Sequence, residues 1–144
     1  MFARILLVWL DERTAAAPPG LIVANPSWVG PGGQQFAHTE AVLVAAAEAD
    51  ADGRWPFDPG AIIKTQPTLK SADGQAWSKR VSGSELRDAL RVADPSRTAG
   101  RFVLVYDDVC TTGSQLNAVA GCLLDQGNAA RVEGVVLARA LWRS

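Results

Sequence analysis

The sequence predicts an α/β domain in which helices cover both faces of a mostly parallel sheet, with residues 1–144 forming a single domain. Short apolar runs with the length of strands alternate with stretches of helical periodicity, the order expected for parallel strands joined by helices. Residues 102–106 are apolar throughout, as in a strand covered on both faces. With 144 residues, 48% of them hydrophobic, the chain is long enough to enclose a core.

The first third of the chain predicts a helix, a strand and a second helix. From Phe2 onward, apolar residues recur at i, i+3, i+4, i+7 and i+8, which places an amphipathic helix within residues 1–19 before a Pro-Pro-Gly stop. Residues 21–24 form a short apolar run typical of a buried strand. Thr39 is a suitable N-cap for the following helix, which is rich in Ala, Val and Leu.

The middle of the chain carries the strongest loop signals. Residues 50–60 are rich in Asp, Gly and Pro and predict a loop, and residues 61–65 are a second candidate strand. Residues 65–84 then show no clear period, and segments of that length in a compact domain are usually functional lids or disordered. Ser82 and Glu85 have the spacing of a capping box, which predicts a short helix.

The last third predicts a strand at residues 102–106, a helix and a final strand at residues 132–138. The helix closes at Gly127-Asn128, two residue types that favour a helix C-terminus. Its apolar stripe consists of Leu116, Val119, Leu123 and Leu124.

Charge and composition exclude several classes of function. The 14 basic and 15 acidic residues give a net charge of −1, so general nucleic-acid binding is not expected. No apolar stretch has the length of a membrane span, and the apolar start of the chain is too short for a signal peptide. Cys110 and Cys122 are too few for a disulfide framework, and they are expected to be small buried hydrophobes in a reduced, cytoplasmic protein.

The segment after residue 106 carries the chemistry. Asp107 and Asp108 follow the apolar strand directly, and a turn of small residues from Cys110 to Gly113 leads to a predicted helix N-terminus. Backbone N–H groups at such a terminus can converge on a phosphate, and adjacent carboxylates can bind a vicinal diol or hold Mg²⁺. Since open α/β sheets bind ligands at the carboxyl ends of their strands, this pattern predicts a site for a sugar phosphate.

These residues also resemble the motif of type I phosphoribosyltransferases that binds 5-phosphoribosyl 1-diphosphate (PRPP): four apolar residues, two acids, two variable residues and Thr-Thr-Gly. Within that fold the chain is most similar to the ComF-like, competence-associated branch. The resemblance implies that residues 102–115 form the PRPP motif. Asp107 and Asp108 would hold the ribose hydroxyls, directly or through Mg²⁺. The 5′-phosphate loop would consist of Thr111, Thr112, Gly113, Ser114 and Gln115.

The resemblance assigns two further segments. Residues 64–84 match the flexible catalytic loop that closes over PRPP, and its cations Lys70, Lys79 and Arg80 would stabilise the charge of departing pyrophosphate. The loop after the first predicted strand matches the position of the pyrophosphate loop, with Pro26, Ser27 and Trp28 as its candidate residues.

The chain departs from the family at three points. Gln115 stands where a small hydroxyl residue is common, which changes one phosphate contact. Thr111 replaces an aspartate that acts on the base in 6-oxopurine phosphoribosyltransferases, which argues against hypoxanthine or guanine as acceptor. The four-cysteine zinc module found at the start of many ComF-like proteins is absent from this sequence.

The expected reaction is Mg²⁺-dependent transfer of the phosphoribosyl group from PRPP to a nitrogen acceptor, with release of pyrophosphate. A regulator that senses PRPP or nucleotides, or a competence-associated partner protein, would keep the same motif without turnover. A phosphoribosyl hydrolase would share the same donor site. The acceptor would be recognised by a variable hood made from the N-terminal helix and residues 139–144, and many members of the fold form homodimers.

Residues outside the motif keep two interpretations each. His38 fits either a base near the pyrophosphate or a cap of the helix that follows it. Trp28, Trp77 and Trp142 fit either stacking on an acceptor base or ordinary packing.

Overall fold

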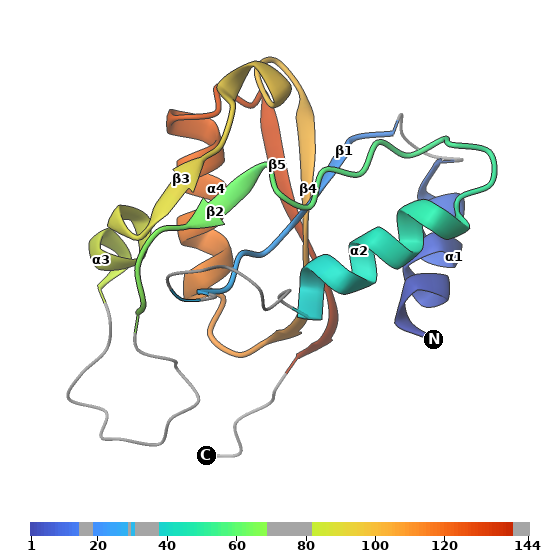
Figure 1. Cartoon of the computed structure of the whole chain (residues 1–144), viewed down its shortest axis with the longest axis horizontal. Coiled ribbons are helices and arrows are strands. Elements are labelled where there is room, and N and C mark those ends of the chain that lie inside the picture. The colour runs from blue at the N-terminus through green and yellow to red at the C-terminus, as the bar shows by residue number, and fades with distance from the viewer. Residues whose placement is uncertain (15–18, 29, 31–37, 69–81, 140–144) are drawn as a thin grey trace.

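The structure is a computed structural model that describes residues 1–14, 19–28, 30, 38–68 and 82–139 (Figure 1). Helices and strands alternate along most of the chain. The elements are α1 (Phe2–Thr14), β1 (Leu21–Ala24), α2 (His38–Ala49), β2 (Ile62–Lys64), α3 (Gly83–Asp88), β3 (Leu90–Val92), the 3-10 helix η1 (Pro95–Arg97), β4 (Phe102–Cys110), α4 (Ser114–Asp125) and β5 (Arg131–Arg139).

The main sheet has three parallel strands in the order β1-β4-β5. Strand β1 pairs with β4 from Leu21 opposite Val103 to Ala24 opposite Tyr106. Strand β5 pairs with the other edge of β4, and this pairing continues to Cys110. The predicted α/β class with a parallel sheet is therefore confirmed, and β4 is the strand paired on both edges.

Helices α1 and α2 lie on one face of this sheet and α3 and α4 on the other (Figure 1), and each face packs against a separate apolar cluster. Side chains alternate along β4, so Val103 and Val105 pack toward α3, α4 and the β2–β3 pair. Leu104 and Tyr106 pack toward α1 and α2 on the opposite face. All four of these β4 side chains are buried, which explains why residues 102–106 are apolar without alternation.

The second predicted strand lies outside the parallel sheet. Strand β2 pairs antiparallel with β3, and the pairing runs from Ile62 opposite Val92 to Lys64 opposite Leu90. The Thr65 N–H and hydroxyl both donate to the carbonyl of Ala89, at 2.8 and 3.2 Å, and extend this pairing. The two ends of the intervening segment are thereby held together.

The capping box before α3 is confirmed. The Glu85 N–H donates to the Ser82 hydroxyl at 3.2 Å, and the Ser82 N–H donates to the Glu85 carboxylate at 2.8 Å. The helix ends at Asp88, and β3 begins two residues later. Strand β3 was not predicted, because three residues directly after a helix do not establish a period of two.

Two further predictions need correction. The apolar strand does not end at Tyr106: β4 continues to Cys110, so the two acidic residues lie within a strand rather than after it. Cys122 is buried as expected, but Cys110 is only half-buried because it lies where β4 leaves the sheet. Within the predicted loop of residues 50–60, Phe57 forms an isolated parallel bridge with Ile22.

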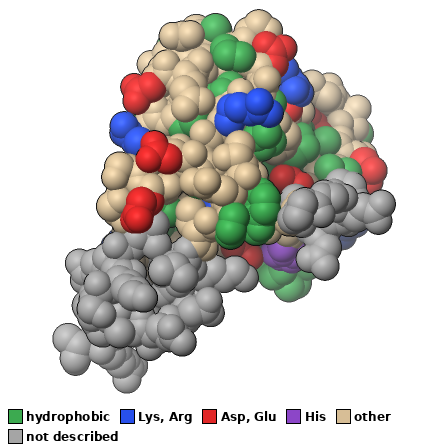
Figure 2. Space-filling view, turned by 60° about the vertical axis from the view of Figure 1, so that its left-hand side comes forward, with side chains coloured by type: hydrophobic (Ala, Val, Ile, Leu, Met, Phe, Trp, Pro, Cys, Tyr) green, Lys and Arg blue, Asp and Glu red, His purple; other side chains and the backbone are tan. Residues whose placement is uncertain are grey.

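No helix in the described part of the chain is long and apolar enough to cross a membrane. On the face shown in Figure 2, acidic and basic side chains of the described residues are interspersed among polar and apolar ones, as the near-neutral net charge suggests.

Candidate functional site

The two acidic residues of β4 lie where the sheet narrows. The last pair between β1 and β4 joins Ala24 to Tyr106, whereas β5 continues alongside β4, with Asp107 opposite Val136. Asp107 and Asp108 therefore have strand β5 on one edge, and on the other the chain that leaves β1. This is the carboxyl end of the parallel strands, where open α/β sheets bind their ligands.

Asn25, the first residue after β1, fixes one of these acids. Its side-chain Nδ2 donates to Oδ2 of Asp107 at 2.9 Å, and the N–H of Asp108 donates to the other carboxylate oxygen at 3.0 Å. The Asn25 N–H donates to the carbonyl of Tyr106 at 2.8 Å, and its own carbonyl accepts from the Thr39 hydroxyl at 3.0 Å. Hydrogen bonds of Asn25 thus connect the end of β1 to residues 106–107 of β4 and to the first turn of α2.

Burial raises the pKa of Asp107 to about 6. The hydrogen bond from Asn25 lowers this pKa, whereas the neighbouring charge of Asp108 raises it. No Lys or Arg among the described residues forms an ion pair with Asp107. A half-buried carboxylate next to a like charge is typical of ligand-binding and catalytic sites.

Tyr106 lies beneath the same acids with its hydroxyl buried. Burial, followed by the charges of Asp108 and Asp107, raises the pKa of Tyr106 to about 12. The Tyr106 hydroxyl therefore stays protonated, and it has no hydrogen-bond partner among the described residues.

The turn after β4 delivers the chain to the N-terminus of α4. Gly113 is the N-cap residue and adopts the left-handed region, with φ of 78°, which glycine tolerates best. The Thr112 and Ser114 hydroxyls lie 3.0 Å apart, and the Ser114 N–H donates to the Thr112 hydroxyl at 3.3 Å. Gly113 has no side chain that could cap the helix, so the start of α4 resembles the helix termini that bind anions.

The remaining residues of the predicted phosphate loop belong to the same turn. Thr111 and Gln115 are half-buried, and the Gln115 side-chain nitrogen is buried without a hydrogen-bond partner among the described residues. An amide donor without an acceptor at a helix N-terminus is compatible with an anionic ligand there.

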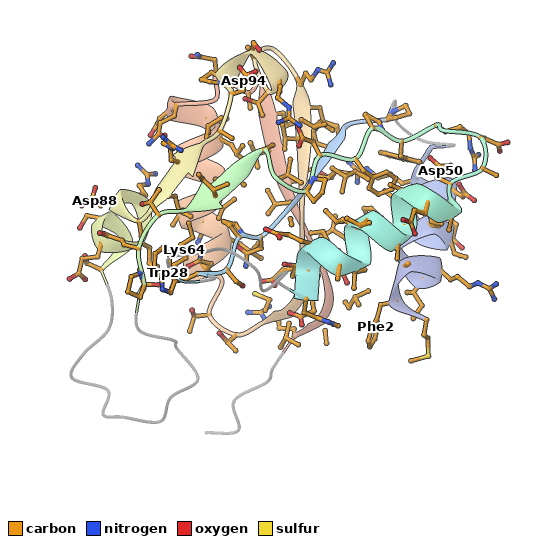
Figure 3. All side chains as sticks on the ribbon, viewed as in Figure 1. Phe2, Trp28, Asp50, Lys64, Asp88 and Asp94 are labelled. Atoms are coloured by element: carbon orange, nitrogen blue, oxygen red, sulfur yellow. The ribbon has the colours of Figure 1, made fainter. Side chains whose placement is uncertain are left out.

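The predicted pyrophosphate loop begins at the same end of the sheet, because it follows β1. Pro26 is buried, whereas Ser27 and Trp28 are exposed. Trp28 lies on the side of the molecule that carries α3 and α4, as does Lys64 of β2 (Figure 3). The structure brings this loop to the acids through Asn25, which the sequence analysis did not select as a site residue. Its position at the end of a buried strand was the available signal.

The three predicted catalytic cations, Lys70, Lys79 and Arg80, lie outside the described residues, as do Trp77 and Trp142. At the start of that predicted loop, Lys64 belongs to β2, and its ammonium group donates to the Thr68 hydroxyl.

His38 is the first residue of α2, and its exposed ring makes an edge-to-face contact with Phe2, with ring centroids 6.1 Å apart. The prediction of Thr39 as the N-cap is wrong: α2 already begins at His38, and the Thr39 hydroxyl donates to the carbonyl of Asn25.

The described residues contain no group of three or more His, Cys, Asp or Glu side chains able to hold a metal ion. Asp107 and Asp108 supply two carboxylates. Mg²⁺ in enzymes is commonly bound by one or two carboxylates together with substrate oxygens and water, so these residues fit a magnesium ion that arrives with its substrate.

Comparison with known proteins identifies the fold. No protein-family profile matches the chain, and no curated protein matches its sequence. It is similar to a crystal structure of adenine phosphoribosyltransferase, with a TM-score of 0.55 and 16% identity over 96% of this chain and 67% of that one. It is also similar to adenine phosphoribosyltransferase from Saccharomyces cerevisiae in complex with adenine and an imino-altritol bisphosphate, with a TM-score of 0.53 and 15% identity over 96% and 66% of the two chains.

The chain therefore has the type I phosphoribosyltransferase fold, as predicted, and spans about two thirds of the length of these solved structures. At these identities the likeness shows the fold alone. Membership of the ComF-like branch remains a prediction.

Proposed function

We propose that this protein is a phosphoribosyltransferase that binds PRPP at the carboxyl ends of β1 and β4 and transfers the phosphoribosyl group to a nitrogen acceptor. The proposal rests on two groups that follow one another along the chain, the Asp107 carboxylate and the N-terminus of α4. Asp107 is a half-buried carboxylate without a cationic partner among the described residues, and the N-cap residue of α4, Gly113, has no side chain to occupy the helix N-terminus. A ligand with a diol at one end and a phosphate at the other would satisfy both.

The carboxylates would bind the ribose. Ionised Asp107 and Asp108 accept hydrogen bonds, and the two hydroxyls of a ribose ring donate them. Bonds to an ionised acceptor are about twice as strong as those between neutral groups, and exclusion of water strengthens them further. The likeness in fold to adenine phosphoribosyltransferases supports this assignment.

The turn from Thr111 to Gln115 would bind the 5′-phosphate. The N–H groups at the start of α4 point away from the helix, and the helix dipole favours negative charge at this end. The Thr112 and Ser114 hydroxyls add donors, and the unpartnered amide nitrogen of Gln115 supplies another. A glycine at position 113 leaves the phosphate access to the backbone.

Magnesium, when bound with PRPP, would neutralise negative charge on the pyrophosphate. The residues that would hold it are Asp107 and Asp108, through the ribose hydroxyls or directly.

In the proposed reaction the bond between C1 of the ribose and the pyrophosphate oxygen breaks, and a bond forms between C1 and the acceptor nitrogen, which then loses a proton. We propose that Lys70, Lys79 and Arg80 stabilise the leaving pyrophosphate and that Pro26, Ser27 and Trp28 line its path. The contribution of the protein is then mainly to position the reactants and to stabilise departing charge.

Calorimetric titration of PRPP in the presence of Mg²⁺ tests the donor site. We expect binding by the native chain and a loss of at least 100-fold in affinity in the double variant Asp107→Asn/Asp108→Asn. Absence of binding to the native chain would overturn the proposal.

Release of pyrophosphate tests turnover. Adenine is the first acceptor to try, because the similar structures are adenine phosphoribosyltransferases. Release that depends on an acceptor supports a transferase, and release in water alone indicates a hydrolase. Binding without release from any acceptor would contradict the enzymatic part of the proposal and favour a regulator that senses PRPP.

A further inference from the structure

We infer that Asn25 is a positioning residue for ribose recognition: its amide holds the Asp107 carboxylate in the orientation that a bound diol requires. The inference rests on the proposed function, because it assigns a role within that same donor site.

Asn25 is held rigidly by its surroundings. Its N–H extends the β1–β4 pairing to the carbonyl of Tyr106, and its carbonyl accepts from the buried hydroxyl of Thr39. The residue is only 9% exposed. With both backbone groups bonded and the side chain enclosed, the position of the amide is set by three different elements of the fold.

The side-chain amide of Asn25 has one favourable orientation. Its Nδ2 donates to Oδ2 of Asp107 at 2.9 Å, while its Oδ1 is buried without a hydrogen-bond partner among the described residues. Rotation of the amide by 180° would place Oδ1 against an ionised carboxylate oxygen, where two acceptors repel. Asn25 therefore acts on Asp107 only as a donor, at the expense of a buried unpaired acceptor.

Few other contacts among the described residues orient the Asp107 carboxylate. Its other oxygen accepts from the N–H of the next residue, Asp108, whose side chain is also a close neighbour, and no arginine or lysine among the described residues forms an ion pair with it. A carboxylate tied by one backbone and one side-chain donor has its plane fixed, and each of its oxygens keeps a lone pair for a ligand hydroxyl. Loss of Asn25 would release the side chain to other rotamers.

The test compares three probes in Mg²⁺: ribose 5-phosphate, 2,3-dideoxyribose 5-phosphate, which lacks the diol, and inorganic pyrophosphate. The native chain is expected to prefer ribose 5-phosphate over the dideoxy compound. In Asn25→Ala this preference should fall about tenfold, which corresponds to the loss of one hydrogen bond to a charged group. The affinity for pyrophosphate should change less than twofold.

Three further variants separate positioning from general damage to the fold. Asn25→Ser keeps a small polar side chain too short to reach Asp107, and it should lose the preference as Asn25→Ala does. Thr98→Val removes a buried hydrogen bond of 2.7 Å to the carbonyl of Gly127, before the start of β4, and should leave the preference unchanged. In an Asp107→Asn background, Asn25→Ala should have no additional effect.

The outcomes are distinguishable. If the native chain fails to prefer the diol, the proposed ribose site is wrong and the inference falls with it. If the native chain prefers the diol and the Asn25 variants do so equally, the inference alone is overturned. Equal losses for all three probes in both Asn25 variants would likewise overturn it, because they would indicate a structural role.

Discussion

Two inward-facing aspartates differ in what surrounds them. Asp58, between α2 and β2, has a side chain only 8% exposed and forms an ion pair of 2.5 Å with Arg97 of η1. Burial raises the pKa of Asp58, and the charge of Arg97 opposes that rise. Asp107 has a neutral amide and a like charge beside it instead, and its pKa rises to about 6.

The two aspartates differ in whether a cation within the protein pairs with the carboxylate. The Asp58 carboxylate has a cationic partner near the amino end of β4, so part of the cost of burying its charge is offset within the protein. Among the described residues, Asp107 has no such partner at the carboxyl end. A fold retains an uncompensated, half-buried charge most readily where a ligand compensates it, which is the pattern of functional sites.

The largest effect is expected from breaking the structural pair. Arg97→Ala leaves the Asp58 carboxylate buried without its cation, and should lower the free energy of unfolding by about 2 kcal/mol at pH 7. Urea unfolding measures this loss. The loss should shrink as the pH falls, because burial raises the pKa of Asp58 and its carboxylate takes up a proton at a higher pH than an ordinary aspartate does, and PRPP affinity should be unchanged. A stability equal to that of the native chain would mean that the pair contributes nothing to the fold.

The opposite sign is expected at the candidate site. Asp107→Asn removes a charge whose pKa is higher in the folded chain than in the unfolded one, so it should raise the free energy of unfolding at pH 7. We expect a gain of about 1 to 2 kcal/mol, since solvent screens part of the effect at a half-buried carboxylate.

This gain should shrink as the pH falls from about 6 toward 3.8, because folded Asp107 takes up a proton in this range while the unfolded chain does so only near its ordinary pKa of 3.8. Urea unfolding at pH 7.5 and 4.5 measures the difference. The control Asp52→Asn changes a carboxylate that is 73% exposed and should alter stability by less than about 0.5 kcal/mol. A loss of stability in Asp107→Asn at pH 7 would show that the charge of Asp107 stabilises the fold.

Ligand binding should report the same titration. Because only ionised Asp107 accepts two hydrogen bonds from a diol, affinity for ribose 5-phosphate should fall about tenfold between pH 7.5 and 5, with a midpoint near pH 6. Calorimetry measures it. The 5′-phosphate titrates in the same range, so Asp107→Asn supplies the background, and only the difference between the two profiles counts. Identical profiles would exclude Asp107 as the titrating group.

The smallest effect is expected from two glycines with positive φ. Gly113→Ala at the start of α4 and Gly100→Ala before β4 place a side chain at φ of 78° and 69°, and each should cost about 1 kcal/mol of stability. Thermal unfolding measures both. Only Gly113→Ala should also weaken PRPP binding, because only that residue lies in the proposed phosphate loop. Equal PRPP affinity in the two variants would place the phosphate elsewhere.

Local signals predicted most of the fold. The four-residue strand β1, the capping box of α3 and the strand–turn–helix from β4 to α4 depend on neighbouring residues, and the structure confirms all three. Pairing between strands was less accessible. Because β2 and β3 are each three residues long, the sequence did not show that β2 pairs antiparallel outside the main sheet.

The candidate site likewise has one part that the local sequence predicts and one part that depends on the pairing of strands. The positions of Asp107, Asp108 and the turn to α4 follow from one continuous motif. The contact between Asn25 and Asp107 joins residues 82 positions apart, and it depends on the register of β1 against β4. That register became visible only in three dimensions, which is why the sequence pointed to the loop after β1 without selecting its first residue.

The pairing of β2 with β3, continued by Thr65 and Ala89, has a consequence for engineering. The chain leaves β2 and returns to β3 at neighbouring positions, and α3, which packs Leu86 into the core, directly precedes β3. The entropy of closing such a loop grows only with the logarithm of its length, about 0.6 kcal/mol for each doubling. Grafting segments of other lengths and sequences between Thr68 and Ser82, which keeps α3 and its capping box, should therefore be a low-cost way to vary the chemistry of the domain.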